Sequence, residues 1–250
     1  MMKRITLLFL ALLPAGLSYG QATEYSLHLT SGFSAFRGPS APNETVLVIP
    51  ANQRDFEFGY MNPRITEPFA VNPFGRKLGL AYGAAGQVQR ISAANLVFGV
   101  QAGYEVLRSR TPVSVIFDKS DAGASANGHA TLANSFINLH AFLGHRFTRG
   151  KLDYDLTTGP EIGWLQRSHE SAEATVESAG REVYTTDLDR SQRKVDVRAR
   201  VNLTAYYQRL GFSVGYSLGL SKYRQDYISS NDKLYSQVFR TGIAYRLTRS

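Results

Sequence analysis

The sequence contains no cysteine. Disulfide cross-links, thiolate metal ligands, cysteine nucleophiles and a lipidated N-terminal cysteine are therefore excluded. Beyond the N-terminal segment, no apolar run approaches the roughly 20 residues that a membrane-spanning helix requires. The His-Glu-x-x-His spacing of zinc hydrolases is also missing. These absences argue against a helical membrane protein, and we expect no metal and no cofactor.

The first twenty residues have the layout of a secretory signal peptide. A basic pair precedes an apolar segment over 5–13, and the small residues Ser18 and Gly20 occupy the −3 and −1 positions of a cleavage site. A segment of nine residues is too short to cross roughly 30 Å of hydrocarbon as a helix, which argues against an N-terminal anchor. We therefore expect a signal peptide (1–20) and one mature domain (21–250).

The net charge is positive, but the basic residues are spread along the chain. The chain carries +8, which becomes +6 once Lys3 and Arg4 are removed. The remaining Lys and Arg residues are distributed over turns, loops and alternating strand positions. A nucleic-acid-binding domain instead gathers its basic residues on one face or one element. We expect no nucleic-acid partner.

Eight segments of the mature chain alternate between apolar and polar residues. Successive side chains of a strand face opposite sides, so this period indicates strands with one apolar face. Two of the segments are 13 residues long, against a mode of 5–6 for strands of soluble proteins. The segments are 25–34, 78–89, 96–106, 137–147, 152–164, 195–207, 212–221 and 238–247.

The links between these segments alternate in length. Three long links (37–76, 109–134 and 167–193) and one of medium length (224–234) alternate with short ones (91–95, 148–151 and 208–211). Barrels that cross the outer membrane have short periplasmic turns and long extracellular loops. The pattern predicts an all-β, transmembrane, up-and-down antiparallel β-barrel of about eight strands, with both termini in the periplasm. Ten strands stay open if the first long link adds a hairpin to the wall.

The polar face carries charges of both signs among small residues. Such a face suits the interior of a narrow barrel, where the charges pair across the wall. A secreted lipocalin-like barrel, the alternative, has an apolar lumen and a polar exterior. The predicted lumen charge network consists of Asp153, Asp155, Glu161, Arg146, Arg198, Arg200 and Arg240.

Aromatic residues gather near both ends of the segments, as they do where rings meet lipid headgroups. The predicted membrane-interface aromatics are Tyr25, Phe33, Tyr104, Phe147, Tyr154, Trp164, Tyr207, Phe212, Tyr223 and Tyr245. Two tight turns also predict registers. A turn centred on residues 149–150 pairs Phe147 with Leu152, and one centred on 209–210 pairs Tyr207 with Phe212.

This architecture resembles the small outer-membrane barrels of Gram-negative bacteria, of the OmpA and OmpX kind and the related PorT-like barrels. The resemblance covers residues 21–250 and rests on strand pattern and loop lengths rather than on a fingerprint motif. It implies location in the cell outer membrane and contact with membrane lipid and lipopolysaccharide. It also implies insertion by the barrel-assembly machinery with periplasmic chaperones.

The long links are the place for a function, because loops on a rigid scaffold usually carry binding. Residues 45–49 and 55–60 read as short strands, and alternation continues over 113–117 and 183–185. We expect a protruding extracellular sheet whose edges can recruit a protein ligand by strand addition. An eight-stranded lumen is filled by side chains, so an open pore is not expected.

An enzymatic role is the alternative, since some small barrels modify lipid A as hydrolases or acyltransferases. Such a site needs a nucleophilic hydroxyl beside a histidine that a carboxylate orients. The one local candidate is His169-Glu170-Ser171 in the third long link. A solvated polar loop explains this cluster better, and we expect no enzymatic activity and no catalytic residues.

Overall fold

The computed structural model describes residues 22–50, 68–117, 123–176, 182–191, 194–223 and 233–248. The predicted signal peptide (1–20) and the short strand expected at 55–60 lie outside these ranges. No helix that could span a membrane occurs in the part of the chain that the structure describes.

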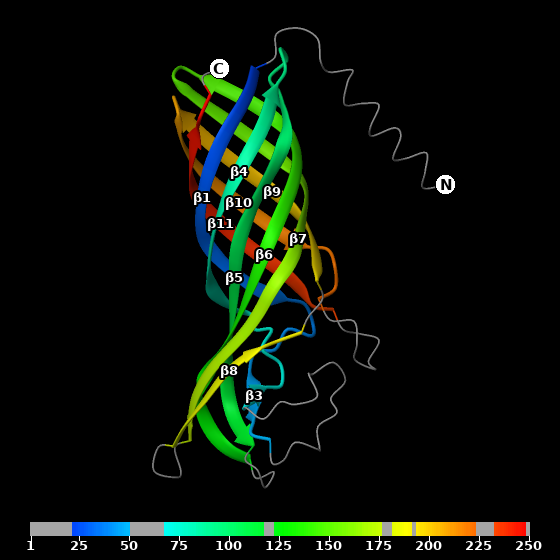
Figure 1. The fold of residues 1–250 in the computed structure, drawn as a ribbon, viewed down its shortest axis with the longest axis vertical. Helices are drawn as coiled ribbons and strands as arrows, with labels where there is room; N and C mark the ends of the chain where they lie inside the picture. Colours follow the sequence, from blue (N-terminus) through cyan, green and yellow to red (C-terminus); the bar gives the residue numbers. More distant parts are fainter. Residues whose placement is uncertain are drawn as a thin grey trace, which may run out of the picture.

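Eight strands close into a ring of antiparallel hydrogen-bonded pairs (Figure 1). The last strand pairs with the first, so the wall has no open edge. This confirms the predicted eight-stranded up-and-down barrel, and the described wall has no added hairpin. The strands are β1 (Ala22–Arg37), β4 (Lys77–Ile91), β5 (Leu96–Phe117), β6 (Gly123–Arg149), β7 (Leu152–Val176), β9 (Val195–Tyr207), β10 (Leu210–Gly219) and β11 (Tyr235–Arg246).

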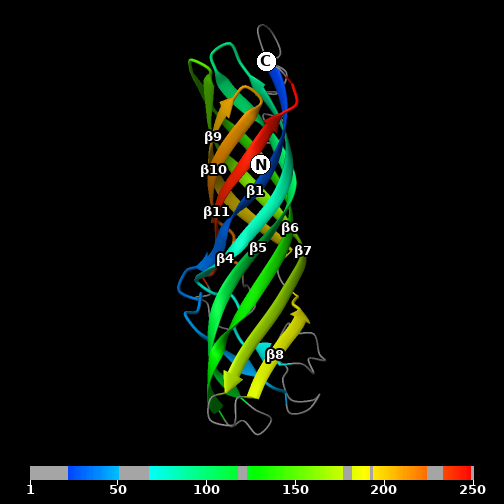
Figure 2. The same cartoon turned by 90° about the vertical axis from the view of Figure 1, so that its left-hand side faces the viewer.

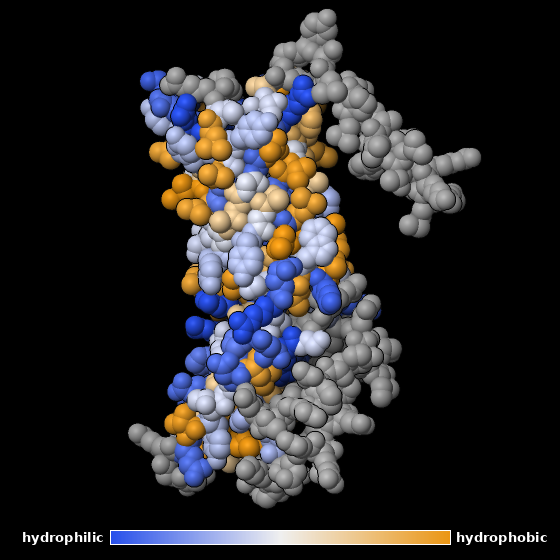
Figure 3. Space-filling model, in the orientation of Figure 1, coloured by the Kyte–Doolittle hydropathy of each residue, from blue (hydrophilic) through white to orange (hydrophobic). Residues whose placement is uncertain are grey.

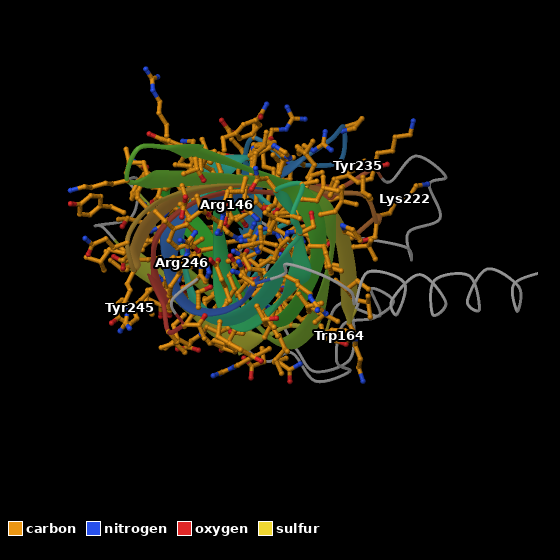
Figure 4. All side chains as sticks on the ribbon, turned by 90° about the horizontal axis from the view of Figure 1, so that it is seen from above. Arg146, Trp164, Lys222, Tyr235, Tyr245 and Arg246 are labelled. Carbon is orange, nitrogen blue, oxygen red and sulfur yellow. The ribbon has the colours of Figure 1, made fainter. Side chains whose placement is uncertain are left out.

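The two faces of the wall differ as a membrane barrel requires. On β1, Leu29 is 67% exposed on the outside, whereas its neighbour His28 is buried in the lumen. Figure 4 shows Arg146 and Arg246 inside the ring and Tyr245 and Trp164 outside it. On the face of the barrel seen in Figure 3, many of the exposed side chains are apolar. An apolar exterior around a charged interior is stable where the surrounding solvent is lipid.

The two tight turns correct the predicted registers. Phe147 opposes Tyr154, not Leu152, and Tyr207 opposes Leu210, not Phe212. The left-handed residue opens each turn: Gly150 has φ 63° and Gln208 has φ 56°. A two-residue hairpin turn places φ > 0 at its first central position, so the turns centre on 150–151 and 208–209. Each correction moves the pairing by two residues, which leaves every side chain on its predicted face.

Three wall strands continue beyond the barrel. β5, β6 and β7 have 22, 27 and 25 residues, whereas a strand needs about 9–11 to cross a membrane. Three short strands join them: β2 (Thr45–Val48), β3 (Phe69–Ala70) and β8 (Glu182–Asp189). Together they form a six-stranded sheet in the order β3-β2-β5-β6-β7-β8, which we call the extension (Figure 2).

The extension lies at the end of the molecule opposite the short turns, the start of β1 and the end of β11 (Figure 1). It contains the strand expected at 45–49 and the segments 113–117 and 183–185, in β2, β5 and β8. Its concave side holds an apolar core of its own. The buried residues of this core are Leu47, Ala70, Val113, Ile116, Ala130, Ala172, Ala174 and Val176.

Candidate functional site

One cluster of charges ties the wall together in the half of the lumen near the short turns. Arg146 on β6 donates to Glu24 on β1 at 2.8 Å and to Asp155 on β7 at 2.6 Å. Arg246 on β11 donates to Asp153 at 2.9 Å. These contacts join four wall strands, β1, β6, β7 and β11.

A second cluster lies deeper, toward the extension. Glu161 is fully buried and accepts hydrogen bonds from Arg198 and Arg200, each at 2.9 Å. Arg240 reaches both Glu161, at 3.1 Å, and Glu105, at 2.8 Å. Asp196 also accepts from Arg198, at 2.7 Å, so three carboxylates balance the three arginines. Buried charges persist only when they are paired and hydrogen-bonded in this way.

The space between the two charge clusters is small and polar. Two cavities of about 20 Å³ each lie there, lined by side chains that include His28, His140, Gln101 and Arg200. A cavity needs roughly 10–15 Å³ to hold one water molecule. These spaces therefore suit one or two ordered waters each rather than a solute.

An apolar plug closes the lumen where the barrel meets the extension. Phe36 packs edge-on against Phe74 and Tyr223, with ring centroids 5.2 and 4.8 Å apart. Leu132 and Phe136 are buried in the same cluster. Side chains thus occupy the lumen from the inner charge clusters to the mouth beside the extension.

Tyr223 corrects one predicted interface aromatic, because it is only 6% exposed and belongs to this plug. It was predicted from its place just past the end of the segment 212–221, but β10 already ends at Gly219. Beyond that residue the chain turns inward, and the Tyr223 N–H donates to the Leu234 carbonyl at 2.9 Å. The other nine predicted aromatics lie at outward positions of the wall strands, where Tyr154 is partly buried and the rest are exposed.

All seven predicted network charges lie in the lumen. Their order along neighbouring segments predicts Asp153, Asp155 and Glu161 beside Arg198 and Arg200, and the observed pairing differs from this. Asp153 and Asp155 contact Arg146 and Arg246, and only Glu161 meets Arg198 and Arg200. The prediction also omitted three lumen carboxylates that complete the clusters. These are Glu24, Glu105 and Asp196, of which the last two stood at polar positions of the alternation.

The candidate catalytic cluster does not assemble. It lies on a strand, so His169 and Ser171 face the outside of the extension while Glu170 faces its core. The histidine instead contacts Asp187 at 3.1 Å and Asp189 at 3.0 Å. Hydrogen bonds from Arg167 and His169 hold the pKa of Asp189 below its usual value. Within the described residues, no group of three His, Cys, Asp or Glu side chains is arranged to hold a metal.

Glu170 has a structural contact on the inner side. Its carboxylate accepts the backbone N–H of Ala70 at 2.7 Å, and Arg190 donates both to Glu170, at 2.6 Å, and to the Ala70 carbonyl. Burial raises the pKa of Glu170, and the Arg190 guanidinium opposes this rise. Two side chains thus satisfy the backbone edge of β3, as a further strand would. β8 has a single strand neighbour, β7, in the described ranges.

Comparison with solved structures finds small bacterial surface barrels. Ail of Yersinia pestis, in complex with the heparin analogue sucrose octasulfate, is 11% identical over 90% of this chain and 99% of that chain, with a TM-score of 0.34. Neisserial surface protein A is 9% identical over 91% of this chain and 99% of that chain, with a TM-score of 0.36. No protein-family model and no curated protein matches the sequence. The fold assignment rests on the hydrogen-bonded ring itself.

Proposed function

We propose that this outer-membrane β-barrel is a closed scaffold that presents a folded binding sheet outside the cell. The observation that carries the proposal is the contrast between its two parts. The lumen is filled by paired charges and an apolar plug, whereas the extension has a separate core and an exposed outer face. The role is structural or binding, and it involves no catalysis and no cofactor.

The filled lumen supports a closed barrel. A solute path would have to break buried contacts such as those of Glu161 and Arg146. Removing one partner of a buried ion pair costs about 3–5 kcal/mol, because the other charge is left uncompensated. An eight-stranded barrel has little room for a side chain to move aside.

The extension supports the binding role. It is built of strands that run on from a rigid wall, so its geometry is fixed before any ligand arrives. The β8 edge offers backbone groups for pairing with a strand of a protein ligand. Rigid presentation lowers the entropy cost of binding.

The proposal includes the maturation of the chain. Residues 1–20 are removed on export, and 21–250 form the outer-membrane domain. Periplasmic chaperones and the barrel-assembly machinery insert it, with the short turns in the periplasm and the extension outside. Lipid and lipopolysaccharide surround the wall.

Single cysteines test this arrangement cleanly because the chain has none of its own. In intact cells, a membrane-impermeant maleimide should label Ser171→Cys on the outer face of the extension. It should label Lys151→Cys, at a short turn, only after the outer membrane is disrupted. Ser217→Cys, which replaces a fully buried lumen residue, should stay unlabelled in both cases.

A conductance measurement completes the test. The purified mature protein in a planar bilayer should show no steady current. Labelling of Ser217→Cys together with a stable open current would contradict the closed scaffold. Labelling of Lys151→Cys in intact cells would contradict the orientation.

A further inference from the structure

Three cationic residues are neighbours where β4 begins and β5 passes from the barrel into the extension. Lys77 lies directly opposite Arg110 in the antiparallel ladder, and both are exposed. Arg108 lies two residues before Arg110 on the same strand. Like charges at directly opposite ladder positions repel each other. An anion bound beside these cations would relieve that repulsion.

Among the described residues, no carboxylate lies within 4.0 Å of these three cations. The row that starts at Arg110 continues across the sheet through Thr131 and Ser171 to Asp187. Three strand spacings separate Arg110 from that carboxylate, which is about 14 Å. This exceeds the Debye length of about 8 Å at physiological salt. Asp187 is moreover engaged by His169.

The lumen shows that this lack of pairing is unusual for the molecule. Each lumen arginine meets at least one carboxylate within 4.0 Å, as Arg146 and Arg240 illustrate. Neither Lys77, Arg108 nor Arg110 has a comparable contact in the described ranges. The unpaired cations are therefore confined to the outside of the barrel.

Their height on the barrel indicates which anion they meet. Leu78, the residue after Lys77, is 57% exposed and belongs to the apolar exterior. The Arg108 guanidinium lies 5.2 Å from the centre of the Tyr82 ring, which is also on the exterior. In Figure 3 hydrophilic side chains gather immediately beyond the apolar part, on the side of the extension. The three cations thus border the acyl chains of the outer leaflet.

We propose that Lys77, Arg108 and Arg110 bind a phosphate group of lipid A, the phosphorylated glycolipid of the outer leaflet. Guanidinium groups match phosphate with two parallel hydrogen bonds, and the lysine adds a point charge. A lipid brings its phosphate to this height because its acyl chains cover Leu78 and Tyr82. The inference deepens the proposed function and rests on its outer-membrane position and orientation, but not on the closed lumen.

The experiment uses the folded mature protein in zwitterionic detergent, titrated with bis-phosphorylated lipid A. The test variant is Lys77→Gln/Arg108→Gln/Arg110→Gln. The matched control is Arg149→Gln/Lys151→Gln/Arg209→Gln, which removes three exposed cations at the opposite rim. Binding is followed through the rise in the temperature at which the heat-modifiable gel band unfolds.

Lipid A should raise this temperature equally in the wild type and in the rim control. The test variant should bind about 100-fold more weakly, since each cation near an anionic surface contributes about fivefold. Lipid A without its phosphates should bind the wild type as weakly as intact lipid A binds the test variant. Inorganic phosphate should have no effect at lipid concentrations.

Three results would overturn the proposal. They are equal lipid A binding by wild type and test variant, tight binding of dephosphorylated lipid A, or an equal effect of inorganic phosphate. If the triple variant does not fold, Arg110→Gln alone is used. Its affinity for lipid A should be about fivefold lower than that of the wild type, and an unchanged affinity would overturn the proposal. None of these results alters the cysteine-labelling or conductance outcomes, so the two proposals fail separately.

Discussion

At the scale of single residues, the lumen is a set of charges that satisfy one another. Glu161 is the centre of the deeper cluster, since three arginines converge on its two oxygens. The cluster as a whole is neutral, with Glu105 and Asp196 as its other carboxylates. Neutrality within the barrel explains why buried arginines are tolerated at membrane depth.

Replacing Glu161 with glutamine should destabilise the barrel by about 3–5 kcal/mol, because a buried positive charge is left uncompensated. The measurement is equilibrium unfolding in lipid vesicles, followed by the fluorescence of Trp164, the single tryptophan. The control is Glu173→Gln on the exposed face of the extension, which should change stability by less than about 0.5 kcal/mol. Equal stability of the two variants would show that the cluster does not hold the wall.

The sequence predicted the face of each charge but not its partner. Alternation assigned Asp153 and Arg198 to the same side, and both lie in the lumen, yet they belong to different clusters. Which charges meet depends on the height of each residue along the barrel. Height follows from the stagger between strands, which no single segment encodes.

At the scale of the elements, the tight turns set the register of the strands they join. Gly150 opens the β6–β7 turn with φ 63°, and a Cβ placed there would meet no atom within 4 Å. The cost of a side chain at this position is therefore conformational rather than steric. For residues with a Cβ, the left-handed region costs about 1–2 kcal/mol.

Gly150→Ala should accordingly lower the free energy of unfolding by about 1–2 kcal/mol without changing the fold. Gly86→Ala is the matched control, since its added Cβ also meets nothing within 4 Å and its φ is not left-handed. That control should be neutral to within about 0.5 kcal/mol. The measurement is the free energy of unfolding of both variants in the same vesicles. An unchanged value for Gly150→Ala would contradict the turn assignment.

The turns also mark a limit of sequence reasoning about elements. The presence of a glycine between residues 147 and 152 predicted the β6–β7 hairpin, but the register was wrong by two residues. Both registers place apolar residues opposite apolar ones, so the pattern alone could not separate them. The left-handed φ of Gly150 and of Gln208 decides between them.

At the scale of the whole molecule, two side chains with similar exposed fractions can have different surroundings, lipid or water. Leu29 on β1 and Val183 on β8 are 67% and 56% exposed. The first lies on the barrel between the exposed aromatics Tyr25 and Phe33, and the second lies on the extension. The architecture therefore places lipid around one residue and water around the other.

Leu29→Arg should lower the free energy of unfolding in vesicles by about 2–4 kcal/mol, the penalty of a cation near the bilayer midplane. The free energy of unfolding of Val183→Arg should lie within about 0.5 kcal/mol of the wild-type value, because the side chain stays in water. Unfolding titrations of both variants measure the difference. Equal stabilities would mean that the barrel exterior does not face acyl chains.

The sequence by itself determined the strand type, the face of the residues in the eight alternating segments and the alternation of short and longer links, while the closed ring decided between eight and ten wall strands. These are local properties, because a period of two and the length of a link can be read along one chain. The tertiary structure decided the pairing of the lumen charges, the burial of Tyr223 and the clamp of Glu170 and Arg190 on Ala70. Many of these contacts join residues that are distant in sequence, such as Glu161 with Arg198 and Glu170 with Ala70. Such residues come together only when the ring closes and the strands of the extension curve.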